Sequence, residues 1–139
     1  MIRVLDASAI VEFLLGTGSA GLVRREVRVP DASLHIPALC DVEVASALRR
    51  LLLNGTLSEA RAVAALEDYL DLPLTRHGHQ ALLARILSLR TNFSAYDATY
   101  VALAERLGGA LVTGDRALAR ATGDHLDIPV VLAEEHRPQ

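Results

Sequence analysis

The chain contains no lysine and no tryptophan, and it has a single cysteine. One cysteine excludes an internal disulfide and is typical of a protein from a reducing compartment. No hydrophobic run approaches the roughly 18 residues of a membrane span. Asp6 and Glu12 interrupt the apolar N-terminal stretch, so we expect neither an export signal nor a membrane segment. These absences together favour a cytoplasmic location.

The 14 basic residues are all arginine, and acidic residues outnumber them, which gives a net charge of −3. This charge argues against indiscriminate nucleic-acid binding. It does not exclude a nucleic-acid ligand, because carboxylates gathered in one metal-filled site would leave the rest of the surface nearer to neutral or basic. With 139 residues, of which 51% are hydrophobic, the chain is expected to fold as one domain with its own core.

Short apolar strands alternate with helical segments along the whole chain. The expected strands are 2–6, 34–36, 74–75, 110–113 and 130–132. The expected helices are 9–15 with Ser8 as N-cap, 22–29, 39–53 opened by Pro37, 59–72, 79–90, 95–107 and 116–121. Such alternation predicts an α/β fold, in which a parallel sheet of four to five strands has helices on both faces. We expect the domain to span 1–133, followed by a polar tail at 134–139.

Four carboxylates fall at equivalent places in this pattern. Asp6 ends the first strand and Asp115 follows the fourth, while Glu43 and Asp97 lie early in two helices. In a parallel sheet, the carboxyl ends of the strands and the helix N-termini that follow them share one edge. Carboxylates brought together there would repel one another unless a divalent cation were present. The pattern therefore predicts a metal-dependent site.

Each acid also has a purely structural interpretation. Asp6 and Asp115 are suitable helix N-caps, and Asp97 is spaced from Ser94 as in a capping box. Glu43 lies off the apolar stripe of its helix, as a solvated glutamate would. The convergence of all four on one edge favours the metal site. Two neighbouring hydroxyls could hold the carboxylates or a water, namely those of Ser8 and Thr113.

Four fragments, in this order, resemble the PIN domain, and in particular the VapC-type toxins of bacterial toxin–antitoxin pairs. They are Asp6-Ala-Ser8, Pro37-Ala-Leu-Cys-Asp-Val-Glu43-Val-Ala-Ser-Ala-Leu, Tyr96-Asp97-Ala-Thr-Tyr-Val-Ala-Leu-Ala and Leu111-Val-Thr113-Gly-Asp115. Each fragment alone is weakly specific, whereas the ordered set, which spans about residues 1–132, is strongly specific.

The resemblance implies an α/β/α sandwich with Mg²⁺- or Mn²⁺-dependent endoribonuclease activity, leaving 5′-phosphate and 3′-hydroxyl ends. It implies a homodimer that a cognate VapB-type antitoxin inhibits, by laying an apolar helix in a groove and placing a basic side chain among the acids. The catalytic and metal-binding residues would be Asp6, Glu43, Asp97 and Asp115, with Ser8 and Thr113 in support. Arg116 is the first candidate for RNA binding, ahead of Arg49 and Arg50. Some family members carry a further acid or asparagine where Arg116-Ala-Leu stands here, so a second metal ligand at this point is in doubt.

Other interpretations remain open at this stage. A catalytically silent PIN-like scaffold that only binds a partner is the main alternative. Residues 16–21 form a literal G-x-G-x-x-G, which would suit a nucleotide-binding module. An aspartyl-phosphate phosphatase is disfavoured, because Ser8 stands where a second aspartate is needed and lysine is absent. We interpret Cys40 as a core residue, and His77 and His79 as loop residues. Tyr96 and Tyr100 could either pack their helix or line the site.

Overall fold

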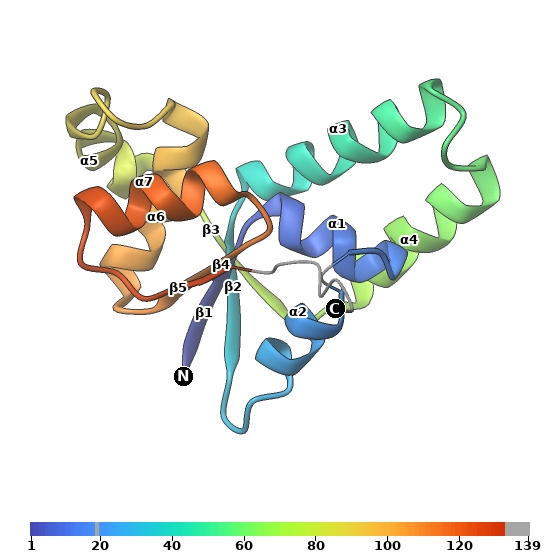
Figure 1. Ribbon diagram of the computed structural model, residues 1–139, viewed down its shortest axis with the longest axis horizontal. Helices are drawn as coiled ribbons and strands as arrows, with labels where there is room; N and C mark the ends of the chain where they lie inside the picture. The colour runs from blue at the N-terminus through green and yellow to red at the C-terminus, as the bar shows by residue number, and fades with distance from the viewer. Residues whose placement is uncertain (19, 133–139) are drawn as a thin grey trace, which may run out of the picture.

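The protein, described here from a computed structural model over residues 1–18 and 20–132, is built on one five-stranded parallel sheet with helices on both faces (Figure 1). The strands are β1 (Ile2–Leu5), β2 (Ser33–Pro37), β3 (Leu74–His77), β4 (Ala110–Thr113) and β5 (Val130–Leu132). The predicted α/β/α sandwich is thus confirmed. The tail expected at 134–139 lies outside the described residues.

The helices divide into two layers according to their position in the chain. One side of the sheet carries α1 (Ala7–Leu15), α2 (Ala20–Val27), α3 (Leu39–Leu53) and α4 (Glu59–Asp71) (Figure 1). The other side carries α5 (Leu83–Ser88), α6 (Ala95–Leu107) and α7 (Arg116–His125), with a short 3₁₀ turn, Gln80–Leu82, before α5. In the described part of the chain, no helix is both long enough and apolar enough to cross a membrane.

The strand order is β3-β2-β1-β4-β5. The chain moves outward from β1 through β2 to β3 and then returns to the opposite side of β1 for β4. Because crossovers between parallel strands are right-handed, this reversal sends the later helices to the other face of the sheet. The reversal lies between β1 and β4, where Leu5 pairs with Val112. In open α/β sheets, binding sites form outside the carboxyl ends of the strands at such a point.

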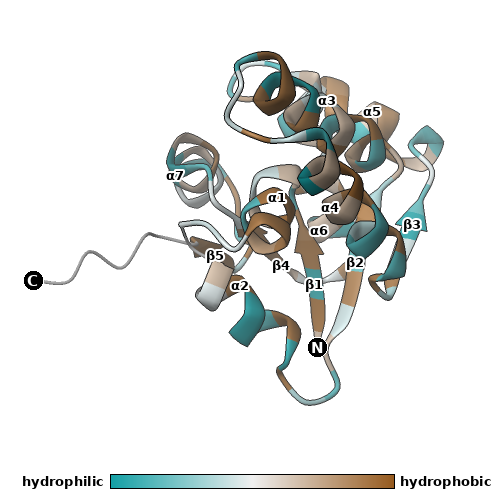
Figure 2. Ribbon diagram, turned by 90° about the vertical axis from the view of Figure 1, so that its right-hand side faces the viewer, coloured by the Kyte–Doolittle hydropathy of each residue, from teal (hydrophilic) through white to brown (hydrophobic). Residues whose placement is uncertain are grey.

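The core lies around the central strands. All four residues of β4 are buried, as are Val4 and Leu5 of β1. Continuous apolar runs of this kind are expected where helices cover both faces of a strand. The edge strand β3 has exposed Thr75 and Arg76 and is hydrophilic in Figure 2. The rigid centre of the sheet therefore directly supports the ends of β1 and β4.

Several element boundaries differ from those predicted. Asp6, rather than Ser8, caps α1, and its side chain accepts a hydrogen bond from the Ala9 amide. Pro37 is the last residue of β2 and does not open α3. The segment predicted as one helix at 79–90 divides into the 3₁₀ turn and α5, and α7 continues to His125.

The glycine-rich segment 16–21 is not a dinucleotide-binding loop. That motif requires a strand before it, whereas this segment follows α1. Gly16 adopts a left-handed conformation with φ of 67° and ends the helix by donating its N–H to the Glu12 and Phe13 carbonyls. The nucleotide-binding interpretation is therefore wrong.

The histidines expected in a loop are in fact held by the fold. His77 ends β3, with its Nε2 2.9 Å from Nδ1 of His35. His79 Nε2 accepts a hydrogen bond from the Leu39 amide at the start of α3. Cys40 is fully buried, as predicted, and burial raises the pKa of its thiol to about 12, so it remains protonated at neutral pH.

Candidate active site

Asp6 stands at the carboxyl end of β1, where the chain turns into α1. Its side chain is buried, with the residue only 5% exposed. Oδ1 accepts hydrogen bonds from the Ser8 hydroxyl at 2.7 Å and the Ala9 amide at 2.9 Å, and Oδ2 accepts one from the Thr113 hydroxyl. A carboxylate offers about four lone pairs, so these three donors orient Asp6 and leave it able to accept one more partner.

The burial of Asp6 has an electrostatic cost. Desolvation is the main cause that raises its pKa from 3.8 to about 6, and the nearby Asp115 raises it further. Hydrogen bonds from Thr113, Ala9 and Ser8 act in the opposite direction. A carboxyl group that is well hydrogen-bonded and still hard to ionise is typical of a site that gains from an added positive charge.

Two hydroxyls tie the loop after β1 to the loop after β4. The Thr113 hydroxyl donates to Asp6 and accepts from the Asp115 amide at 2.9 Å. The Ser8 hydroxyl donates to Asp6 and accepts from the Gly114 amide at 3.0 Å. Asp115 caps α7 by accepting from the Leu118 amide at 3.1 Å. The positions of Asp6 and Asp115 are therefore fixed relative to one another.

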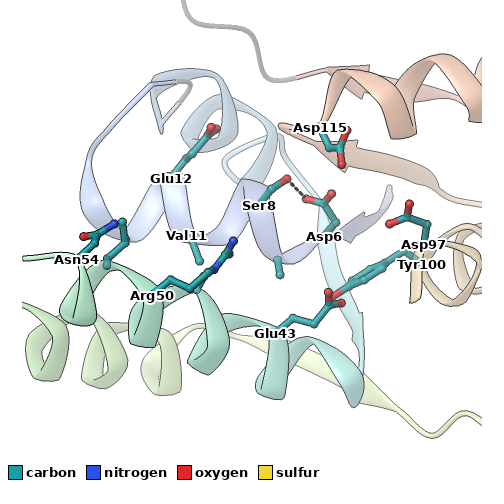
Figure 3. Close-up of a pocket in the computed structure, with 13 residues that line it drawn as sticks. Asp6, Ser8, Val11, Glu12, Glu43, Arg50, Asn54, Asp97, Tyr100 and Asp115 are labelled. Atoms are coloured by element: carbon teal, nitrogen blue, oxygen red, sulfur yellow. Dashed lines mark hydrogen bonds between the residues drawn. The ribbon is translucent and has the colours of Figure 1, made fainter. Parts of the chain in front are cut away.

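Glu43 reaches the site from α3, in the second turn of the helix. Its Oε1 is buried without a hydrogen-bond partner among the described residues, and so is the hydroxyl of Tyr100. In Figure 3 the ring of Tyr100 extends toward the Glu43 carboxylate. A buried polar atom without a partner costs about 1–3 kcal/mol. The Tyr100 hydroxyl interacts with Glu43, which helps to raise the pKa of Tyr100, and the Glu43 carboxylate keeps lone pairs for a further partner.

Asp97 approaches from the first turn of α6, where the Ser94 hydroxyl caps the helix by accepting from the Asp97 amide at 3.1 Å. The pKa of its half-buried carboxyl is raised by desolvation and by the charges of Asp115 and Glu43. Asp115 thus acts on both Asp6 and Asp97, and Glu43 also acts on Asp97. The four carboxylates are consequently one electrostatic cluster.

All four predicted acids and Ser8 line one cavity of about 490 Å³ (Figure 3). Of the two tyrosines that could either pack their helix or line the site, Tyr100 lines the cavity. Tyr96 is exposed elsewhere on α6. Thr113 is fully buried and contacts Asp6 from behind the cavity wall. Arg116 is exposed at the start of α7 and does not line the cavity.

The side chains present suit a hard divalent cation. All four acidic groups offer oxygen, the ligand atom that Mg²⁺ and Mn²⁺ prefer, and the orphaned Glu43 oxygen is available to such an ion or its waters. Within the described residues, no three acidic, histidine or cysteine side chains already converge on a single ion position. Mg²⁺ commonly binds through only one or two carboxylates and keeps several waters.

The cavity extends beyond the acids to residues that sequence reasoning missed or ranked low. The additional polar lining residues are Glu12 of α1, Arg50 of α3 and Asn54, which follows α3. Their spacing in the sequence could have predicted this position. Glu12 is one turn after Ser8, and Arg50 is two turns after Glu43, so each shares a helix face with a residue already assigned to the site.

The chain is similar in sequence to a known protein family and to several known proteins. Residues 3–124 match the family model described as the PIN domain. Ribonuclease VapC9 of Mycobacterium tuberculosis is 43% identical over 128 residues, covering 92% of this chain and 97% of that protein. Ribonuclease VapC3 of the same organism is 44% identical over 118 residues, covering 85% of each chain. The crystal structure of VapBC2 from Rickettsia felis, bound to a DNA fragment from their promoter, superposes with a TM-score of 0.69. It is 14% identical and covers 95% of this chain and 98% of that one.

Proposed function

This chain belongs to the PIN-domain family, and from that premise we propose that it is a divalent-metal-dependent endoribonuclease, the toxin of a type II toxin–antitoxin pair. The observation that carries the proposal is the convergence of Asp6, Glu43, Asp97 and Asp115 on one cavity at the switch point of the sheet. Family membership alone would be compatible with a silent scaffold. An intact acidic cluster favours an enzyme.

We assign Mg²⁺ or Mn²⁺ as the cofactor, with Asp6 and Asp97 as the main ligands. Glu43 and Asp115 complete the site, either directly or through water. When bound, the cation supplies positive charge that stabilises negative charge developing on an RNA phosphate and lowers the pKa of a water molecule. Divalent-metal dependence is general among PIN-domain ribonucleases, whereas the preference between the two ions is our proposal.

The chain's own residues orient the reacting groups. Ser8 and Thr113 hold the Asp6 carboxylate in one direction, so little reorganisation is needed when a ligand arrives. An ionised acid of the cluster that does not bind the cation directly can orient a water for in-line attack on phosphorus and accept its proton. The bond between phosphorus and the 3′-oxygen breaks, and this oxygen takes a proton from solvent. The expected products carry 5′-phosphate and 3′-hydroxyl ends. Arg116, beside Asp115, is a candidate for contacting RNA outside the cavity.

The partner we propose is a VapB-type antitoxin, since relatives of this chain are named VapC and one solved neighbour is a VapBC complex. The acidic cavity suits a basic antitoxin side chain, which would neutralise the carboxylates in place of the cation. We also propose that the toxin is a homodimer.

Cleavage of RNA by the purified protein tests the function. We expect discrete cleavage of total RNA in Mg²⁺ or Mn²⁺, none with chelator, and a loss of at least about a hundredfold in Asp6→Asn. Asp68→Asn, an isosteric change at an exposed acid of α4 outside the cavity, is the matched control and should cleave like the wild type.

A folded, antitoxin-free protein that binds the metal but cuts no RNA would contradict the proposal and favour the silent scaffold. Equal cleavage by the wild type and Asp6→Asn would locate the activity elsewhere or identify a contaminating nuclease.

A further inference from the structure

We propose that Arg50, assisted by Asn54, forms a phosphate-binding subsite for single-stranded RNA at the end of the cavity remote from the carboxylates. The inference rests on the proposed ribonuclease function. It assigns substrate binding to the groove between α1 and α3, through residues that contact neither the acids nor the expected cation.

The subsite follows from the periodicity of α3. Glu43, Ala47, Arg50 and Asn54 are spaced by four, three and four residues, which places them along one helix face, and all four line the cavity. Val11 and Glu12 of α1 line it from the opposite side (Figure 3). At 1.5 Å per residue, Arg50 stands about 10 Å along the helix axis from Glu43. The cavity is thus a groove with the four clustered acids at one end and Arg50 toward the other, and Glu12 of α1 adds a further carboxylate to its lining.

Among residues 1–18 and 20–132, the charge of Arg50 has no carboxylate counterpart. The ion pairs formed by the described residues are Arg3 with Glu26, Arg76 with Asp41 and Arg85 with Glu105. Arg50 is the basic residue of the cavity lining, and no carboxylate of the described part lies within ion-pair distance of it. Its planar guanidinium therefore keeps its donors available for an anion, and phosphate suits their fork geometry.

Asn54 presents a second donor beside Arg50. Its Oδ1 accepts a hydrogen bond from the Thr56 amide at 2.9 Å, which fixes the orientation of the side-chain amide. The amide NH₂ is left to donate toward the groove. Two neighbouring donors, one of them charged, provide what a phosphate group needs from a protein.

The dimensions favour an RNA strand. A stacked strand carries one phosphate per 3.4 Å, so about three nucleotides span the roughly 10 Å between the acidic end and Arg50. One phosphate can then lie at the carboxylates while a phosphate about three nucleotides along the strand meets Arg50. The cavity of about 490 Å³ also exceeds the roughly 180 Å³ that six waters around a cation occupy, at about 30 Å³ each.

The test measures binding of a 5′-fluorescein-labelled, mixed-sequence single-stranded RNA of 12 nucleotides as a function of NaCl. It uses the Asp6→Asn protein, so that the RNA stays intact. Adding Arg50→Gln should raise the dissociation constant roughly tenfold and reduce the salt slope by about 0.7, the value for one lost phosphate contact on a single strand. Adding Arg106→Gln is the matched control, because Arg106 is an exposed arginine in the last turn of α6 outside the cavity lining, and it should change neither quantity.

In the otherwise wild-type enzyme, Arg50→Gln should raise KM for a cleaved RNA while changing kcat less than twofold, since the acids are intact. Equal salt slopes for Arg106→Gln and Arg50→Gln would overturn the subsite. Unchanged RNA affinity together with weakened binding of the co-expressed antitoxin would also overturn it and assign Arg50 to an acidic protein segment. Absence of cleavage by the wild type contradicts the ribonuclease function instead, and a reduced salt slope would still support the subsite.

Discussion

Among the single residues of the site, Asp6 is subject to two opposing effects on its pKa. Three donors hold its carboxylate in place, yet burial keeps its pKa near 6. The folded protein without metal therefore binds a proton at Asp6 more tightly than the unfolded chain does. The stability that Asp6 contributes is complete below about pH 4 and is lost as pH rises through about 6.

The loss of stability with rising pH leads to a measurable difference between the wild type and Asp6→Asn. In chelator, the stability of the wild type relative to the variant should fall between pH 4 and pH 8, by up to about 3 kcal/mol for a shift of roughly two pKa units. Asparagine cannot ionise, so the variant lacks this dependence. Urea unfolding at the two pH values measures the difference. A difference that stays constant with pH would contradict the electrostatic account of Asp6.

Residue-scale prediction from sequence succeeded where a residue's place in an element determined its surroundings. Asp6 and Asp115 follow strands of a predicted parallel sheet, whose carboxyl ends share one edge, so their convergence could be predicted. The orphaned Oε1 of Glu43 and the position of Arg50 could not, because they depend on how α3 is rotated against α1. Helix rotation is determined by side-chain packing rather than by local pattern.

At the scale of elements, two glycines of similar appearance have different roles. Gly109 leads from α6 into β4, and a Cβ placed there would lie 2.5 Å from Cγ2 and 2.8 Å from the backbone oxygen of Ile2 in β1. Gly123 lies within α7, where a Cβ would meet nothing within 4 Å. The absence of a side chain is thus required at the first position but not at the second.

Gly109→Ala should destabilise the protein by about 1–3 kcal/mol, because β1 and β4 would have to separate beneath the site. Gly123→Ala should instead stabilise it by about 0.5–1 kcal/mol through improved helix propensity. Denaturant midpoints of the two variants measure both effects. Similar midpoints for the two variants would refute the close approach of β1 and the loop before β4.

One error in predicting elements concerns where α1 begins. Asp6 was expected to end a strand and Ser8 to cap the helix, but β1 ends at Leu5 and Asp6 caps α1, which therefore begins at Ala7. A capping side chain is recognised in sequence by residue type, and Asp6 and Ser8 are both suitable types. The choice between them depends on Thr113, which lies far away in the sequence, on the neighbouring strand β4, and donates a hydrogen bond to Asp6.

At the scale of the whole molecule, the strand order accounts for the position of the site. Because β4 returns to the far side of β1, the loops after these two strands diverge to opposite faces and leave a crevice between them. The helices α3 and α6 bring Glu43 and Asp97 to this crevice from opposite layers (Figures 1 and 3). This topology gathers the four acids, and we propose that together they hold one functional divalent-metal centre.

Calorimetric titration of Mn²⁺ into the wild type, Asp97→Asn and the surface control Asp68→Asn tests that claim most directly. We predict saturable binding to the wild type and the control, and at least about a tenfold loss of affinity in Asp97→Asn. Equal affinity in all three proteins, or no binding by the folded wild type, would contradict it.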